Sequence, residues 1–294
     1  MKYAVLITAY NDFDLLEKQV NYLRNDAYLY IHIDKKSKIP NEIITRLEKL
    51  DNTKIIRKYK IYWGSYKHIL AIIDLLKMAY DDGCEYYSIV SENTITVKPI
   101  EEIVNYFEKN IYNIYMEVKS KKDNNSFSEF DFRYKSYFFQ DIYNHRSRCY
   151  GFRIMSYYLE RISAYIQRAI GIRKGIEFNY KGYVYCHMSR IAVQRVLEKV
   201  KEDASYLKEL RRCYVGEEFF FQNIIMNSDL KEYVINDSLI YDDWDKGNPA
   251  FLDEEDIDNI EKSNKLFARK VKVDSILVKR YLLNEWRFDD REKI

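Results

Sequence analysis

The sequence predicts an α/β fold, a mainly parallel sheet flanked by helices, and two observations carry this prediction. Short apolar runs at residues 2–8 and 28–33 alternate with helix-like segments at about 12–23 and 41–50. This alternation is typical of parallel sheets, because parallel neighbours need a crossover connection, usually a helix. The chain is also 47% hydrophobic, which is ample for a large core. Since no repeat or linker divides it, we expect one domain over residues 1–294.

Later segments continue the alternation less regularly. Apolar runs predict further strands at 55–57, 86–90 and 181–189. Helical patterns predict helices from Ser65 to about Tyr80, at 190–200, and after residue 271. The polar residues 119–128 predict a mobile loop, and residues 245–249 a tight turn.

Charge and cysteine usage exclude several classes of protein. A net charge of +2 does not indicate a nucleic-acid partner. The four cysteines are far apart and lack metal-ligand spacing, which predicts free thiols in a reducing compartment. The first residues lead directly into a strand-like run, with no signal-peptide pattern and no apolar stretch of membrane-spanning length. We therefore expect a cytoplasmic protein.

The ends of the first two strands form a candidate nucleotide site. In open α/β sheets, ligands bind beyond the carboxyl ends of the strands. This places Ala9, Tyr10 and Asp34 at the expected edge. No glycine-rich loop follows the first strand, so a dinucleotide site and a P-loop are both excluded.

Two adjacent carboxylates, Glu217 and Glu218, open an aromatic and apolar run that carries no further acid until Asp229. Acids in a first turn favour a helix start. A carboxylate at the mouth of an apolar helix loses solvation, so its pKa rises towards the range of a general base. The alternative is a pair of helix-start acids above a core helix.

No metal site is expected from the residue spacing. His187 lies in an apolar strand-like run without a partner at ligand spacing. Asp12-Phe13-Asp14 and Asp243-Trp244-Asp245 have the Asp-x-Asp spelling, but one falls at a helix start and the other in a late loop. We interpret both as coincidence.

Residues 146–174 carry seven arginines and lysines against one acid, Glu160, with aromatic and aliphatic residues between them. This is the pattern of a basic amphipathic helix, which can lie on an anionic membrane surface. The alternative is a helix packed on the sheet with a solvated basic face.

Seven segments, in order along nearly the whole chain, carry a family resemblance. They are Ala4–Asn11, Tyr30–Ser37, Trp63–Tyr66, Gly182–Arg190, Glu217–Gln222 with Asn227-Ser228, Trp244 with Asn248-Pro249, and Phe267–Lys270. Together they resemble the core-2/I-branching β-1,6-N-acetylglucosaminyltransferase family, which also contains the peptide O-xylosyltransferases. The resemblance implies a GT-A-like (Rossmann-like) fold.

The resemblance also implies an activity. It is the inverting transfer of a sugar, GlcNAc or xylose, from a UDP-sugar to a glycan or glycolipid hydroxyl, without a bound metal ion or other cofactor. The expected setting is surface polysaccharide biosynthesis. The absence of Asp-x-Asp in Ser91–Val97, where GT-A enzymes usually have it, agrees with a metal-independent reaction.

Residue roles follow by matching positions. Glu218 matches the catalytic base, and Lys270 matches the basic residue that contacts the UDP diphosphate, with Arg269 beside it. Ala9, Tyr10 and Asp34 match the nucleoside pocket. Further candidate donor or acceptor contacts are Trp63, Glu217, Tyr185, Trp244 and Lys246.

Two segments depart from the family pattern. Ser91–Val97 lacks the family's Asp and Pro, and Leu239-Ile240-Tyr241 lacks an Arg that bacterial members often carry. If that Arg is a second diphosphate contact, Lys246, Arg269 or Lys265 must replace it. Two other hypotheses remain open: a sugar-nucleotide-binding protein that has lost activity, and a membrane-associated scaffold led by residues 146–174.

Overall fold

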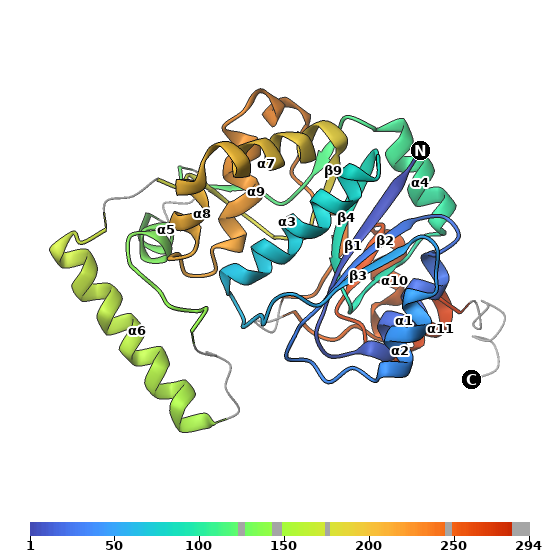
Figure 1. The fold of residues 1–294 in the computed structure, drawn as a ribbon, viewed down its shortest axis with the longest axis horizontal. Helices are drawn as coiled ribbons and strands as arrows, with labels where there is room; N and C mark the ends of the chain where they lie inside the picture. The colour runs from blue at the N-terminus through green and yellow to red at the C-terminus, as the bar shows by residue number, and fades with distance from the viewer. Residues whose placement is uncertain (123–126, 143–148, 174–176, 245–248, 284–294) are drawn as a thin grey trace.

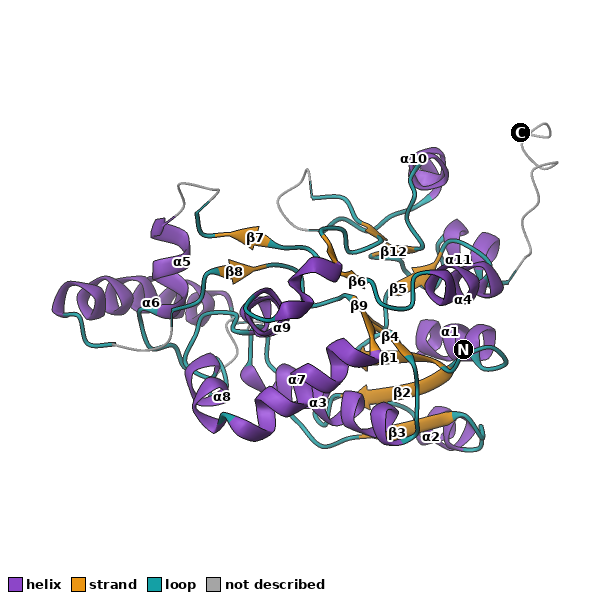
Figure 2. Ribbon diagram, turned by 90° about the horizontal axis from the view of Figure 1, so that it is seen from above, coloured by secondary structure: helices purple, strands orange, loops and turns teal. Residues whose placement is uncertain are grey.

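The computed structural model is built around one seven-stranded sheet (Figures 1 and 2) and describes all residues except 123–126, 143–148, 174–176, 245–248 and 284–294. The strand order is β10-β6-β9-β4-β1-β2-β3. These strands span Val234–Ile235, Ile114–Tyr115, His187–Ser189, Tyr86–Ser91, Tyr3–Ala9, Tyr28–Ile33 and Thr53–Ile56, respectively. β4, β1, β2 and β3 run parallel, whereas β9 is antiparallel to both β4 and β6. The predicted α/β architecture is confirmed.

Helices cover both faces of this sheet. α3 (Tyr66–Asp81), α7 (Arg190–Glu202) and α9 (Glu217–Met226) pack against one another on one face, and α1 (Phe13–Leu23) and α2 (Asn41–Glu48) pack together on the other (Figure 2). All residues of β1 and β4 are buried, which explains why both read as continuous apolar runs.

The remaining elements extend this core. α4 (Ile100–Lys109) stacks Phe107 on Tyr86 of the sheet. A second sheet has the order β11-β12-β5, and β7 pairs with β8. Their bounds are Ile240–Tyr241, Phe267–Arg269, Thr94–Thr96, Lys119–Ser120 and Tyr180–Lys181, in the order named. The other helices are α5 (Phe127–Tyr134), α6 (Tyr150–Ile170), α8 (Ala204–Leu210), α10 (Ile257–Lys262) and α11 (Ile276–Tyr281), with short 3-10 turns at Asp229–Tyr233 and Glu254–Asp256.

Two glycines let the chain approach the start of α9. Gly64 has a positive φ of 70°, and a Cβ there would lie 2.7 Å from the Gln140 side chain. Gln140 accepts the N–H of Val215, just before the helix, at 2.8 Å. Gly182 donates its N–H to the Glu218 carbonyl, and a Cβ there would lie 1.8 Å from the Glu117 carbonyl oxygen. Glycine is therefore required at both positions.

Several sequence-based expectations are wrong in detail. Residues 119–128 are not wholly a loop, because Lys119 and Ser120 form β7 and α5 begins at Phe127. The strand expected at 181–189 is two strands, β8 and β9, because the residues between them bond α9: Gly182 donates to the Glu218 carbonyl, and the Tyr183 carbonyl accepts from Gln222. β5, β6, β10, β11 and β12 were not expected. The turn predicted at 245–249 falls largely outside the described residues.

Asp12 and His187, two residues of types that can bind metal ions, have structural roles. Asp12 caps α1 by accepting the N–H of Leu15 at 3.2 Å. His187 is fully buried between Ser88, which meets Nδ1 at 2.7 Å, and the Ser238 carbonyl, 2.9 Å from Nε2. Burial lowers the His187 pKa to about 3, so the ring is neutral.

None of the described helices is both long and apolar enough to cross a membrane. α6 is 21 residues long but includes Arg153, Glu160, Arg161 and Arg168. It does not pack on the sheet, contrary to one of the two expectations. It lies at the outer end of the molecule, beside α5 (Figure 1).

Candidate active site

The ends of β1 and β2 are tied to each other by short backbone connections. Asp34 donates its N–H to the Ala9 carbonyl at 2.8 Å, and the Ser37 hydroxyl donates to the Tyr10 carbonyl at 2.6 Å. The Asp34 carboxylate is buried, accepts the N–H groups of Lys36 and Ile61 at 3.0 and 3.3 Å, and pairs with the Lys36 ammonium. Ala9 is buried, whereas the Tyr10 side chain is exposed. A ligand at this edge meets an ordered surface.

A histidine on α3 links β1 to the first turn of α9. His68 contacts the Glu217 carboxylate through Nδ1 and the Thr8 hydroxyl through Nε2, the latter at 3.2 Å. In the tautomer that donates Nδ1–H to Glu217, Nε2 accepts the Thr8 hydroxyl proton. Both side chains of the His68–Glu217 pair are largely buried. Glu217 is therefore fixed towards the carboxyl edge of the sheet.

Glu218 faces a different neighbour. Its carboxylate pairs with Arg133 of α5 and remains 32% exposed, so a substrate hydroxyl can reach it. Burial raises the Glu218 pKa above the ordinary carboxyl range, and the Arg133 charge limits that rise. Adjacent helical residues project about 100° apart, which separates the His68 contact of Glu217 from the Arg133 contact of Glu218. The two carboxylates have distinct environments.

A cation lies at the end of β4. Arg269 of β12 donates through Nε to the Ser91 hydroxyl at 3.1 Å and through Nη1 to the Tyr183 hydroxyl. Its guanidinium lies 4.8 Å from the centre of the Tyr185 ring, which in turn packs edge-on against His68 at 6.5 Å. Contacts therefore run without a break from Thr8 through His68 and Tyr185 to Arg269.

Glu92, directly after β4, is a buried carboxyl beside this cation. It is 1% exposed, and neither carboxylate oxygen has a hydrogen-bond partner. Burial raises its pKa to about 7, although Arg269 and the nearby backbone N–H groups of Glu92 and Tyr10 oppose the rise. Its backbone is fixed from both sides, because its N–H donates to Thr8 and its carbonyl accepts Gln19.

Replacing Glu92 by Gln should stabilise the protein most at high pH. The pKa of Glu92 is higher in the folded than in the unfolded protein. Burial of the neutral carboxyl therefore costs no ionisation energy below about pH 4.5, and the free energy of unfolding falls as pH rises from there to about 7. At about 1.4 kcal/mol per pKa unit, Glu92→Gln should gain ~3 kcal/mol at pH 8 and much less at pH 5. Urea unfolding at both pH values measures this, with exposed Glu48→Gln as control. An equal gain at both would contradict the assignment.

The comparison with protein families covers most of the chain. Residues 3–263 match the family described as Core-2/I-Branching enzyme. The chain belongs to this family. The family resemblance predicted from the seven segments is confirmed, and with it membership of a glycosyltransferase family. No curated protein matches the chain as a relative.

Solved structures of S. aureus TarS are similar over part of the fold. TarS 1–349 in complex with UDP has 16% identity, with 42% of this chain and 37% of that chain covered and a TM-score of 0.30. The complex with UDP-GlcNAc has 17% identity, 42% and 36% coverage, and the same TM-score. The matched part is less than half of either chain, and this chain spans little more than a third of the TarS segment.

In this family member the predicted site residues do not form one contact network. Glu217, Tyr185 and Arg269 are linked through His68; Ala9 and Asp34 bond each other; Glu218 pairs with Arg133; and Tyr10 is exposed at the rim. Lys270 instead lies with its ammonium 5.9 Å from the Phe251 ring. Trp63 packs on Tyr214, and the exposed Trp244 packs on Tyr183 and donates Nε1–H to Asp242. Lys246 lies outside the described residues.

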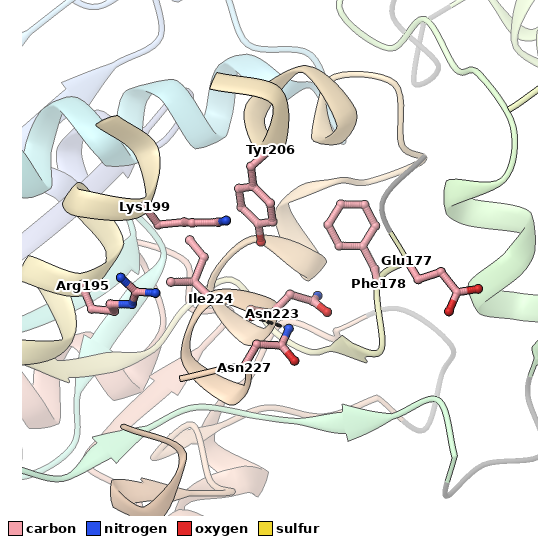
Figure 3. A pocket seen from close by; sticks show the side chains of 8 residues that line it. All are labelled: Glu177, Phe178, Arg195, Lys199, Tyr206, Asn223, Ile224 and Asn227. Atoms are coloured by element: carbon pink, nitrogen blue, oxygen red, sulfur yellow. Dashed lines mark hydrogen bonds between the residues drawn. The ribbon is translucent and has the colours of Figure 1, made fainter. Parts of the chain in front are cut away.

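A separate cavity of about 150 Å³ lies elsewhere (Figure 3). It is lined by Glu177, Phe178, Arg195, Lys199, Tyr206, Asn223, Ile224 and Asn227. Its α9 residues come from the second half of the helix, beyond Glu217 and Glu218. No predicted site residue lines it. Among the described residues, no three His, Cys, Asp or Glu side chains are grouped to hold a metal ion.

Proposed function

We propose that this chain is an inverting glycosyltransferase that transfers a sugar, GlcNAc or xylose, from a UDP-sugar to a hydroxyl of a glycan or glycolipid. One observation carries the proposal. A line of contacts runs from Thr8 and Glu217, through His68 and Tyr185, to the Arg269 guanidinium, near the edge where α/β sheets bind ligands, and Glu218 follows Glu217 directly in α9. Inverting transfer needs a base beside the acceptor hydroxyl and a positive charge beside the leaving diphosphate.

Each group has a role in the proposed reaction. Glu218 accepts the proton of the acceptor hydroxyl, whose oxygen forms the new bond to the anomeric carbon. The bond from that carbon to the diphosphate breaks on the opposite face, and UDP leaves with the bonding electron pair. Arg269, with Lys270 nearby in sequence, stabilises the departing diphosphate. The side chain of Arg133 holds the Glu218 carboxylate in place.

The nucleoside of the donor is assigned to the turn after β1 and to Asp34. That turn is held by Asp34 N–H and by Ser37, so the site is ordered before the ligand binds. Preorganised contacts of this kind reduce the entropic cost of binding. Tyr185 is buried between His68 and Arg269, so its assigned role is to position these two side chains beside the donor. We propose that the reaction occurs at the cytoplasmic side of the membrane, in surface polysaccharide synthesis.

A sugar-nucleotide-binding protein without transfer activity is the second candidate. Ile240, where bacterial relatives often carry Arg, is a buried residue of β11 and supplies no charge. Acceptor-dependent release of UDP distinguishes the two, because a binding protein retains the donor intact.

Transfer should not require a divalent cation. The proposal rests on the position of Arg269, which bonds Ser91 at the end of β4, where a metal-binding Asp-x-Asp is usual in GT-A enzymes. Rates of UDP release measured in excess EDTA and in Mn²⁺ should agree within about twofold. A collapse of the rate in EDTA, restored by Mn²⁺, would show that a metal ion supplies the charge instead.

A further inference from the structure

α6 contacts the rest of the protein through a narrow polar side. Of its 21 residues only Ser156 and Ala164 are buried. The Ser136 hydroxyl donates to the Ala164 carbonyl at 3.2 Å, and the Gln167 side chain bonds both backbone groups of Tyr137. Ser156, Ala164 and Gln167 are eight and three residues apart along α6, so they lie on one face of the helix. The helix is held to the body by its small and polar residues.

The apolar side of α6 faces solvent. Five large side chains at spacings of one, three or four residues lie together on it and are 51–75% exposed: Tyr158, Leu159, Ile162, Tyr165 and Ile166. A surface helix of a globular protein normally turns this side to the core. The arrangement here is the reverse, and Met155 and Ile170 enlarge the exposed apolar area. Contiguous exposed apolar surfaces of this kind mark interaction sites.

The charges and aromatic residues of α6 identify the partner. Arg153, Arg161 and Arg168 stand against the single acid Glu160. Arg161 and Arg168 are seven residues apart, on one edge of the apolar side. Two of the exposed aromatic residues on the apolar side, Tyr158 and Tyr165, combine an apolar ring with a polar hydroxyl, which suits the boundary between lipid headgroups and acyl chains. A helix with these features lies in the plane of an anionic lipid surface.

We propose that α6 docks this protein onto anionic lipid bilayers, with the Tyr158–Ile166 side inserted and Arg161 and Arg168 among the headgroups. The sequence predicted the basic stretch at 146–174, of which 146–148 and 174 lie outside the described residues. α6 lies at the outer end of the molecule (Figure 1), and its apolar side chains are exposed, so a flat surface can reach them. Docking does not depend on the proposed transfer activity.

Two adjacent residues of α5 connect this surface with the candidate site. The Arg161 guanidinium lies 5.8 Å from the centre of the Phe132 ring, and Arg133 pairs with Glu218. These contacts link α6 to the Arg133–Glu218 pair, where the acceptor is proposed to bind. If the proposed function holds, the acceptor is a lipid-linked glycan whose hydroxyl reaches Glu218 from the membrane. This consequence rests on the proposed function.

Sedimentation with phosphatidylglycerol vesicles tests the docking. The full chain should bind them at low salt, bind pure phosphatidylcholine vesicles far more weakly, and detach as salt rises. Leu159→Glu with Ile162→Glu should reduce binding by at least about a hundredfold. Arg161→Gln with Arg168→Gln should reduce it about thirtyfold. All four residues are exposed, so the melting temperature should stay near that of wild type.

Matched controls lie on other elements. Ile191→Glu changes an exposed apolar residue of α7, and Arg24→Gln with Lys49→Gln removes two exposed charges beside α1 and α2. Both controls should bind like wild type. The proposal is overturned if phosphatidylglycerol vesicles do not bind, or if the controls lose as much affinity as the α6 variants. It is also overturned if wild type dimerises, the Leu159→Glu/Ile162→Glu variant is monomeric, and neither binds vesicles, because α6 is then a protein interface.

Discussion

Glu218→Gln is expected to lower the rate of sugar transfer by at least about a hundredfold while UDP affinity changes little. The amide keeps the shape of the side chain but cannot accept the acceptor proton. Because Glu218 points to Arg133 and not to the β1 edge, the nucleotide contacts should survive. Initial rates of UDP release, measured beside UDP affinity by calorimetry, separate the two effects.

Glu217→Gln is the matched control for this variant. Its amide can still hydrogen-bond His68, so the rate should fall less. The wild-type rate should also fall with decreasing pH from a point above the usual carboxyl range, because burial raises the Glu218 pKa and only the ionised form is a base. If Glu217→Gln loses turnover while Glu218→Gln keeps it, the base is Glu217. If both keep turnover, neither carboxylate is the base.

Removal of the diphosphate cations should weaken UDP binding by roughly ten- to a hundredfold per residue, since hydrogen bonds to charged groups contribute about 1.5–3 kcal/mol. Arg269→Gln and Lys270→Ala test the two candidates separately. The contacts of Arg269 with Ser91 and Tyr183 join it to the site, whereas the family resemblance selects Lys270. Uridine, which lacks phosphate, should bind each variant as it binds wild type.

Lys272→Ala is the control for charge, because Lys272 is exposed and lies over the same Phe251 ring as Lys270. Its UDP affinity should equal that of wild type. Parallel loss of UDP and uridine binding would indicate a disturbed fold. Unchanged UDP affinity in both Arg269→Gln and Lys270→Ala would exclude the assigned diphosphate site.

The sequence predicted the first half of the sheet better than the second. β1, β2 and β4 have six or seven residues each, and their near-complete burial produces long apolar runs. β5, β6 and β8 to β12 have only two or three residues, too few to show any periodicity. Tertiary pairing determines these short strands. Tertiary contacts also end β8, because Gly182 bonds the Glu218 carbonyl and so separates β8 from β9 within one apolar stretch.

Residues of the candidate site could be proposed from sequence where their chemistry is visible in adjacent residues, and were missed where the contacts arise across the fold. Glu217 and Glu218 stand out because two acids precede an apolar run. His68 follows the recognised Trp63–Tyr66 segment by two residues, but nothing there indicates its contacts with Thr8 and Glu217, which are 60 and 149 residues away. Arg133 lies just beyond a segment predicted as loop. Nothing in the sequence around Glu92 indicates that its carboxyl is buried beside Arg269, and this burial is what raises its pKa.

The central claim is that the carboxyl edge of this sheet binds a UDP-sugar. Calorimetric titration of the full chain in EDTA with UDP, UDP-GlcNAc, UDP-xylose, ADP and NAD tests it most directly. The account predicts that UDP and at least one UDP-sugar bind, that ADP and NAD do not, and that Arg269→Gln or Lys270→Ala weakens UDP. Absence of UDP binding, or equal binding of ADP and UDP, would contradict it.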